Sequence, residues 1–237
     1  MSGRTAVVTG GARNIGQAIA LRLLDDGHDV RVLDIVAPED ARLAAGARIV
    51  DVSDIAALRD ALDEVVAEAP VACLVNNVGI VIPARLEDTD LADFDRLMHV
   101  NLRAAIACAQ AVVPGMKAAG FGRIVMNTSR VTRGKIARTL YSASKGAAQS
   151  MARTWALELA PHGITVNCVA PGPIATDAFW QNNPPDSPET QAIVSAVPVG
   201  RMGTPEDVAN AVGFFCDPRA GFVTGQTIFV CGGVSVG

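Results

Sequence analysis

Hydrophobic and polar positions divide this chain into short β-rich runs and longer helical stretches. Seven runs of mostly apolar, often β-branched residues predict strands, and they cover residues 5–9, 30–33, 48–50, 71–75, 122–128, 164–169 and 226–230. Most of these runs are apolar at nearly every position, which is typical of a parallel sheet that is covered on both faces.

The stretches between these runs carry apolar residues at helical spacing. They predict helices over residues 15–24, 54–68, 91–119, 141–160 and 205–216. Ser53 is the expected N-cap of the second helix, Thr204 with Pro205 opens the last, and Pro114 should kink the third. Because strands alternate with helices, we expect the α/β class: one doubly wound, Rossmann-type domain over residues 1–237, with a seven-stranded, mostly parallel sheet flanked by helices.

Residues 176–198 follow neither pattern, because Pro184, Pro185 and Pro188 fall within five residues. We interpret this segment as a long loop with helical pieces that forms a substrate lid. It contains Phe179 and Trp180, which either close over an apolar substrate or pack the lid against the body of the domain.

Composition narrows the function classes. The chain has 237 residues, 20 basic and 24 acidic, for a formal net charge of -4, and 50% of its residues are hydrophobic. This mix excludes a disordered tail, a fibrous repeat and a disulfide scaffold. The acidic balance argues against nucleic acid as the main partner.

The sequence also predicts a cytoplasmic protein. No signal peptide is visible, and the apolar stretches fall below the ~18 residues that suggest a membrane span. The five cysteines are scattered without zinc-site spacing, which indicates free thiols in a reducing cytosol. The three histidines also lack ligand-like spacing, so we expect no metal site.

A glycine-rich turn follows the first strand and opens the first helix. It reads TGGARNIG from Thr9 to Gly16, within a βαβ unit, and this context favours a dinucleotide-binding loop. Gly10 permits the tight turn, Gly16 permits close packing of helix on strand, and the free N–H groups of the helix face a pyrophosphate. The alternative is a glycine-rich turn that binds nothing.

Three further strands end in polar residues. Asp34 closes the second strand, where a carboxylate accepts the ribose hydroxyls of NAD and repels the 2′-phosphate of NADP. The alternative for Asp34 is a solvated loop residue or a helix cap. Asp51 closes the third strand and can accept a hydrogen bond from the adenine amino group. Asn77, Val78 and Gly79 follow the fourth strand, at the edge where open α/β sheets bind ligands.

Tyr141 and Lys145 form the most informative pair. Tyr141 is the only tyrosine of the chain, and a lysine four residues later lies on the same face of a helix. A nearby ammonium favours the phenolate, so we expect Lys145 to lower the pKa of Tyr141 toward a range useful for proton transfer. The alternative is a tyrosine with a surface lysine as its neighbour.

In their order along the chain, these segments resemble the short-chain dehydrogenase/reductase family. The resemblance covers nearly the full length and includes Asn101 in the long helix, Ser129 after the fifth strand and the Pro171-Gly172 pair after the sixth. It implies that Tyr141 is the general acid/base, that Ser129 positions the substrate oxygen, and that Lys145 binds the nicotinamide ribose. It further implies that Asn101 holds a water that links Lys145 to solvent.

The expected cofactor is NAD, with NADP as the alternative. By the same resemblance, Ile174 faces the carboxamide and Thr176 holds it or the phosphates. The residues assigned to the cofactor site are Gly10, Arg13, Asn14, Ile15, Gly16, Asp34, Ile35, Asp51, Val52, Asn77, Val78, Gly79, Tyr141, Lys145, Pro171, Gly172, Ile174 and Thr176.

Three positions depart from the family pattern. Asn14 replaces the middle glycine of the loop, and asparagine tolerates positive φ better than other non-glycine residues. Ser129 lies one residue closer to Tyr141 than usual, and counting back from Tyr141 would select Thr128 instead; we favour Ser129. Arg13 stands where NADP-using relatives often carry a basic residue, so it competes with Asp34 as a cofactor signal.

The substrate side carries a basic loop. Arg130, Arg133, Lys135 and Arg138 fall within nine residues between Ser129 and Tyr141. They either pair with a carboxylate, a phosphate or a coenzyme A tail, or form a solvated surface or a subunit contact. We assign Ser129, Arg130 and Trp180 to the substrate site.

The sequence thus predicts an oxidoreductase that moves a hydride between a nicotinamide cofactor and a small-molecule secondary alcohol or ketone. The alternatives are a non-catalytic NAD(P)-binding sensor or scaffold on the same fold, and an epimerase or dehydratase that uses the hydride internally. The resemblance also implies a homo-oligomer, most often a homotetramer. Function resides in the site rather than in the fold, so the identity of the substrate stays open.

Overall fold

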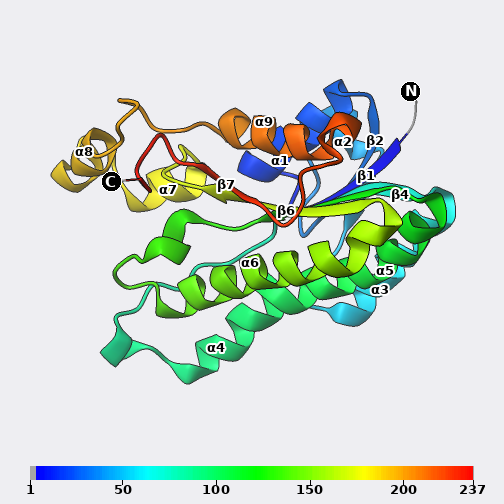
Figure 1. Cartoon of the computed structure of the whole chain (residues 1–237). Coiled ribbons are helices and arrows are strands. Elements are labelled where there is room, and N and C mark those ends of the chain that lie inside the picture. Colours follow the sequence, from blue (N-terminus) through cyan, green and yellow to red (C-terminus); the bar gives the residue numbers. More distant parts are fainter. Residues whose placement is uncertain (1–3, 237) are drawn as a thin grey trace.

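The computed structural model describes residues 4–236, apart from the side chains of residues 178 and 182, and its centre is one parallel sheet (Figure 1). The sheet has seven strands in the order β3-β2-β1-β4-β5-β6-β7. Every neighbouring pair is parallel, so the doubly wound α/β expectation is confirmed and the sheet is parallel throughout. The strands are β1 (Arg4–Thr9), β2 (His28–Asp34), β3 (Ala47–Ile49), β4 (Val71–Asn76), β5 (Gly122–Asn127), β6 (Ile164–Pro171) and β7 (Thr227–Val230).

Helices cover both faces of the sheet, which explains why the strands are apolar at nearly every position (Figure 1). On one face, α3 (Ile55–Glu68), α5 (Ala104–Ala119) and α6 (Thr139–Leu159) pack against alternate residues of the central strands. On the other face, α1 (Asn14–Asp25), α2 (Ala41–Ala44) and α9 (Pro205–Cys216) form a second apolar layer. The buried stripe of α6 is rich in alanine, and small side chains let this helix approach the sheet closely.

The chain reverses its direction of winding at β1. This strand pairs with β2 on one side and with β4 on the other, so the connections that follow β1 and β4 leave a crevice between them. In open α/β sheets, ligands bind in that crevice, beyond the carboxyl ends of the strands. The fold therefore brings the glycine-rich turn after β1 beside the Asn77–Gly79 segment after β4.

The long helix expected over residues 91–119 is three consecutive helical segments. α4 (Leu91–Met98) passes into a π-helical turn, η2 (His99–Arg103), and then into α5, which continues through Pro114 to Ala119. Contrary to the sequence expectation, this 29-residue stretch is long and apolar enough to cross a membrane by length and composition alone. Core helices of soluble proteins pass the same test, and α5 buries one apolar face, with Val112 and Met116, in the core layer that also contains α3 residues.

The helix ends test the two N-caps that the sequence predicted. Thr204 does cap α9, in a reciprocal capping box with Asp207. The expected Ser53 cap is wrong: Asp54 caps α3, because its carboxylate accepts the N–H groups of Ala56 and Ala57 at 3.0 Å each. Within residues 176–198, the helical pieces are α7 (Asp177–Asn182) and α8 (Pro188–Ser195).

The shorter helical turns lie at the ends of these elements. They are η1 (Leu86–Asp88), η3 (Arg130–Arg133), η4 (Ala160–His162) and η5 (Pro218–Ala220).

Candidate functional site

The glycine-rich turn between β1 and α1 has a backbone shape that lets other groups approach it closely. Gly10 has φ +65° and Asn14 has φ +49°, so Asn14 adopts the left-handed conformation that its replacement of a glycine requires. A Cβ on Gly16 would lie 1.7 Å from the Gly10 carbonyl oxygen, so only glycine fits there. Arg13 occupies the N-cap of α1 and makes no side-chain cap, and no acidic residue lies in the first turn. The N–H groups of α1 therefore favour an anion.

An amide network holds the ends of β1, β4 and β5 together. The Asn77 Nδ2 donates to the carbonyl oxygens of Thr9 (3.0 Å) and Gly10 (3.1 Å), and Asn77 Oδ1 accepts from Asn127 Nδ2 at 2.7 Å. The Thr9 hydroxyl accepts the N–H groups of Asn77 and Val78. These bonds fix the crevice in shape, because each strand end is tied to its neighbour.

A cavity of about 740 Å³ opens at this crevice. Nine of the residues assigned to the cofactor site line it, from four different strand ends: Gly10, Arg13, Asp34, Ile35, Asp51, Val52, Asn77, Val78 and Gly79. The Ile35 side chain is 61% exposed at the rim, an apolar surface that a planar ring can cover. The Asp51 carboxylate accepts the Ser53 N–H at 2.8 Å, and this bond lowers its pKa, so it is an anionic acceptor in the cavity.

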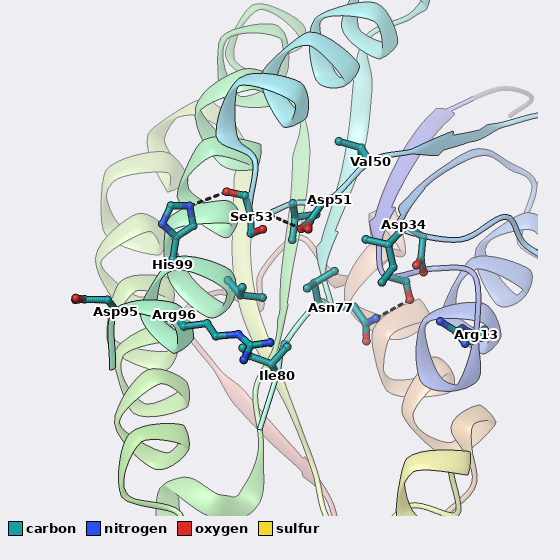
Figure 2. A pocket seen from close by; sticks show the side chains of 16 residues that line it. Arg13, Asp34, Val50, Asp51, Ser53, Asn77, Ile80, Asp95, Arg96 and His99 are labelled. Carbon is teal, nitrogen blue, oxygen red and sulfur yellow. Dashed lines mark hydrogen bonds between the residues drawn. The ribbon is translucent and has the colours of Figure 1, made fainter. Parts of the chain in front are cut away.

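The two opposing cofactor signals share one wall of the cavity, as Figure 2 shows. Asp34 Oδ2 accepts the N–H of Ala12 at 2.9 Å, and Oδ1 accepts that of Val36 at 3.3 Å, so the carboxylate is held by the backbone on both sides. Arg13 is exposed, and no salt bridge joins it to Asp34 in the part of the chain that the structure describes. Both residues are therefore free to meet the same part of a ligand.

Tyr141, Ser129 and Lys145 meet at the start of α6. Lys145 Nζ lies 5.7 Å from the centroid of the Tyr141 ring and donates to the Asn127 carbonyl at 2.8 Å. The Ser129 side chain favours the phenolate of Tyr141 and so opposes the rise of the Tyr141 pKa, and the Ser129 hydroxyl accepts the Val131 N–H at 3.2 Å. The Thr128 hydroxyl is buried and donates to the Val169 carbonyl at 3.0 Å, so the geometry favours Ser129 over Thr128.

Burial dominates the electrostatics of this group. It raises the pKa of Tyr141, although the hydrogen bond from Ser129 and the charge of Arg138 oppose the rise. The expected lowering by Lys145 is therefore not what the structure gives, because desolvation of the phenolate outweighs the neighbouring groups that favour it. Burial also lowers the pKa of Lys145 to about 8. Gly79 makes room for this lysine, since a Cβ there would lie 2.9 Å from Nζ.

Asn101 reaches the site because of the π-helical turn. It is buried, its Oδ1 accepts the Ile80 N–H at 2.8 Å, and its Nδ2 donates to the Ile80 carbonyl and to Ser144 Oγ. Ser144 in turn donates to the Tyr141 carbonyl at 2.9 Å. The extra residue of a π turn redirects one side chain, and such turns are frequent at functional sites. Here Asn101 connects the π turn η2 to Ser144 in α6.

The remaining predicted residues have structural roles near the site. Asn14 Oδ1 accepts the Asp177 N–H at 3.0 Å, which ties the glycine-rich turn to α7, and Ile15 packs against the core beside it. Thr176 caps α7 by accepting the Phe179 N–H. Ile174 is buried, Pro171 ends β6, and the Gly172 N–H donates to the Val230 carbonyl.

Trp180 stacks edge-on against Phe179, with ring centroids 5.0 Å apart. Its side chain is 36% exposed, so it is partly available at the surface of α7. Arg130 begins η3, directly after Ser129.

Sequence reasoning missed a wall of the cavity. Ser53, Ile80, Arg96 and His99 line it, and His99 Nε2 contacts the Ser53 carbonyl at 2.8 Å. Figure 2 shows Arg96 extending from α4 toward Ile80, across from Arg13 and Asp34. These residues carry no motif, and only His99 lies in the π turn, which hydrophobic spacing does not reveal. Among the residues described, no group of three or more His, Cys, Asp or Glu is placed to hold a metal ion.

The polar groups around the cavity fit a dinucleotide. The open N-terminus of α1 and the sterically required Gly16 suit a pyrophosphate, while Asp34 and Asp51 offer acceptors in the same cavity as the exposed Ile35.

The chain is similar to several known proteins over nearly its full length. The family model described as enoyl-(acyl carrier protein) reductase matches residues 10–235. The (2S)-[(R)-hydroxy(phenyl)methyl]succinyl-CoA dehydrogenase subunit BbsD of Thauera aromatica is 37% identical over 98% of this chain and 97% of its own length. A chloroplastic NADPH-dependent aldehyde reductase-like protein of Arabidopsis thaliana is 36% identical over 98% and 94%.

A solved structure from Beutenbergia cavernae is also similar. That protein is assigned as an NAD(P)-dependent gluconate 5-dehydrogenase and carries NADP at low occupancy. It is 33% identical and superposes with a TM-score of 0.91, covering 100% of this chain and 98% of its own.

Proposed function

Because the chain belongs to the short-chain dehydrogenase/reductase family, and is therefore an oxidoreductase that uses a nicotinamide cofactor, we propose that its substrate is a secondary alcohol or ketone. The observation that carries this proposal is the buried ammonium of Lys145, 5.7 Å from the centroid of the Tyr141 ring, with Ser129 acting on the same phenol. Two hydroxyl groups at one point suit chemistry at a carbon–oxygen bond, because they can hold and protonate an oxygen. The relatives reported above, named as dehydrogenases and an aldehyde reductase, support the same reading.

We assign the proton transfer to Tyr141. Its Oη would give a proton to the carbonyl oxygen during reduction and take the hydroxyl proton during oxidation. Burial keeps the pKa of Tyr141 high, so the phenol is protonated at neutral pH and is ready as the acid for reduction. In oxidation, the Ser129 hydrogen bond and the Arg138 charge favour the phenolate.

Ser129 and Lys145 would orient the reactants. Ser129 sits at the N-cap of η3, which fixes its hydroxyl against Tyr141 and lets it hold the substrate oxygen. Lys145 is held by the Asn127 carbonyl and would hydrogen-bond the nicotinamide ribose. Asn101, through Ser144, would hold the first turn of α6 and a water beside Lys145.

The cofactor, when bound, supplies the carbon that accepts or gives the hydride. We propose that NAD is favoured and that NADP is accepted. Asp34 would accept the ribose hydroxyls and repel a 2′-phosphate, while Arg13 would attract that phosphate. Several relatives carry NADP or NADPH in their names, which supports keeping NADP as a second cofactor.

Fluorescence titration with NADH and with NADPH tests the cofactor assignment. Tighter binding of NADH to the wild type, and a shift toward NADPH in Asp34→Ala, would support it. Tighter NADPH binding to the wild type, lost in Arg13→Ala, would overturn the NAD preference.

Tyr141→Phe tests the catalytic assignment against the alternative of a non-catalytic sensor. The wild type should oxidise or reduce members of a secondary alcohol and ketone panel, and the variant should lose at least about 100-fold in kcat, within the range that general acid–base groups contribute. Its affinity for the cofactor should stay within about threefold, because the phenol hydroxyl is small. NADH binding without turnover of the whole panel by the wild type would favour the sensor.

We also propose a homo-oligomer, most often a tetramer in this family, in the cytoplasm. Phe214 on α9, Phe222 before β7 and Ile228 on β7 are large exposed apolar residues along one edge of the sheet. Exposed strand edges with apolar neighbours are usually covered by another chain. All five cysteines are free and buried, which suits a reducing compartment. Light scattering that finds a stable monomer would refute the assembly.

A further inference from the structure

The segment between Ser129 and Tyr141 concentrates positive charge at the site. Arg130 begins η3 directly after Ser129, and Arg138 lies at the N-cap of α6, three residues before Tyr141. The chain turns back between them, at Gly134 (φ +98°) and Ala137 (φ +57°). In Figure 1, this green segment lies at the same end of the molecule as α7 and α8.

Charges of this segment act on one another, and one of them acts on Tyr141. The pKa of Lys135 is lowered by burial and then by the charges of Arg138 and Arg130. The charge of Arg138 also acts on Tyr141. Arg138, three residues before Tyr141, therefore acts on the phenol, and Arg130, next to Ser129 in the chain, acts with Arg138 on Lys135.

The fourth cation, Arg133, points toward β7. The Arg133 guanidinium lies 4.9 Å from the centroid of the Phe229 ring, on β7. It therefore belongs to the same loop without being aimed at the site.

Ion pairing sets these cations apart from several other arginines of the described chain. Six other arginines of the described chain pair with carboxylates: Arg22, Arg31, Arg42, Arg48, Arg201 and Arg219. None of the salt bridges within residues 4–236 involves the four cations of the loop. Arg138 is fixed by the pairing of its backbone with Ala84, and its Nη1 donates to the Ala137 carbonyl at 2.8 Å. Its other N–H groups remain for an anion.

We propose that Arg130, Lys135 and Arg138 bind an anionic group of the substrate, so that the alcohol or ketone carries a carboxylate or a phosphate near the reacting oxygen. This inference rests on the proposed function, because it places the anion beside Ser129 and Tyr141. Unpaired cations beside a reaction centre attract and orient an anionic substrate, and arginine holds carboxylate and phosphate through paired N–H groups.

Matched substrates test the proposal. The first series is 3-hydroxybutyrate, 4-hydroxypentanoate and 5-hydroxyhexanoate, each compared with its methyl ester, so that only the charge changes at three distances from the hydroxyl. Glycerol 3-phosphate against glycerol forms the phosphate arm. We expect kcat/KM for at least one anion to exceed that of its neutral partner by about 10- to 100-fold, the range of one charge-assisted hydrogen bond. Added salt should reduce this ratio.

Two variants of the same helix, η3, form the critical pair. Arg130→Gln should lower the anion-to-neutral ratio by about tenfold, whereas Arg133→Gln, which removes the same charge from a residue turned to Phe229, should leave the ratio within about twofold. A second measurement does not need turnover: malonate binding to the protein–NADH complex by calorimetry should weaken in Arg130→Gln and persist in Arg133→Gln.

The outcomes separate the two proposals. Turnover of the neutral esters and glycerol with ratios near one, and no malonate binding, would overturn the anion site and leave the proposed function standing. Malonate binding that depends on Arg130, without turnover of any alcohol, would support the anion site and count against the proposed function. Equal effects of the two variants would overturn the assignment to Arg130.

Discussion

Lys145 is expected to destabilise the folded protein, although we assign it to the binding of the cofactor. Its side chain is 5% exposed, and its Nζ donates to the Asn127 carbonyl at 2.8 Å. Burial lowers its pKa from 10.5 to about 8, so at pH 7 the protein holds an ammonium in a poorly solvated place. Lys145→Met keeps a long side chain and removes this charge, and it should give a more stable but inactive protein.

The magnitude follows from the pKa. A pKa lowered from 10.5 to about 8 corresponds to roughly 3 kcal/mol of free energy against the charged form in the folded state. Loss of the hydrogen bond to Asn127 offsets about 1 kcal/mol of the gain. Lys145→Met should therefore raise the free energy of unfolding by about 2 kcal/mol at pH 7.

The difference between the two proteins should depend on pH. Below about pH 8 the lysine is protonated in both the folded and the unfolded state, and the penalty is present in full. Between about pH 8 and 10.5 the unfolded chain keeps a proton that the folded chain has released, so the stability of the wild type rises relative to the variant. The advantage of the variant should be gone by about pH 10.5.

Urea unfolding at pH 7, 8, 9 and 10, at one protein concentration and without cofactor, measures this difference. The exposed Lys117 offers the matched control, since Lys117→Met should change stability by less than about 0.5 kcal/mol at pH 7. A Lys145→Met protein that is less stable than the wild type at pH 7, or a difference that does not shrink toward pH 10, would refute the reasoning.

Three further substitutions test the glycine-rich turn and the helix caps. Gly16→Ala should weaken NADH binding by at least about tenfold, because its Cβ would meet the Gly10 carbonyl at 1.7 Å; unchanged affinity in a fluorescence titration would contradict this. Asn14→Gly should speed amide exchange in α7, measured by mass spectrometry, because it removes the acceptor of the Asp177 N–H; equal exchange in both proteins would show that this bond does not hold α7. Thr204→Ala should lower the free energy of unfolding by about 1 kcal/mol in urea, and no change would mean that the capping box is unimportant for α9.

Local pattern predicted most of the elements because burial on both faces leaves a clear signal. The apolar runs at 5–9 and 71–75 correspond to β1 and β4 with one residue added at an end. An N-cap was harder to predict where two adjacent polar residues are both good caps. Ser53 and Asp54 are such a pair, and α3 begins so that Asp54 is its cap. The π turn at His99–Arg103 leaves apolar spacing almost unchanged, so the long helix appeared uniform.

The candidate site likewise contains some residues that the sequence could identify and others that it could not. Gly16, Tyr141 and Lys145 could be identified from sequence because steric limits and chemistry restrict these positions to few residue types. Arg96 could not, since nothing in its neighbours distinguishes it from any exposed helical arginine.

By itself, the sequence determined which groups this protein can use: a turn that only glycine permits, a phenol with a lysine one helical turn away, and cations without neighbouring acids. Those properties are local, because they depend on side-chain chemistry and on spacing along one element. Only the tertiary structure decided their environment. Burial sets the directions of the Tyr141 and Lys145 pKa values, and packing aims Arg133 at Phe229 while Arg138 acts on Tyr141. Solvent access and distance across elements depend on the whole fold, so no local pattern encodes them.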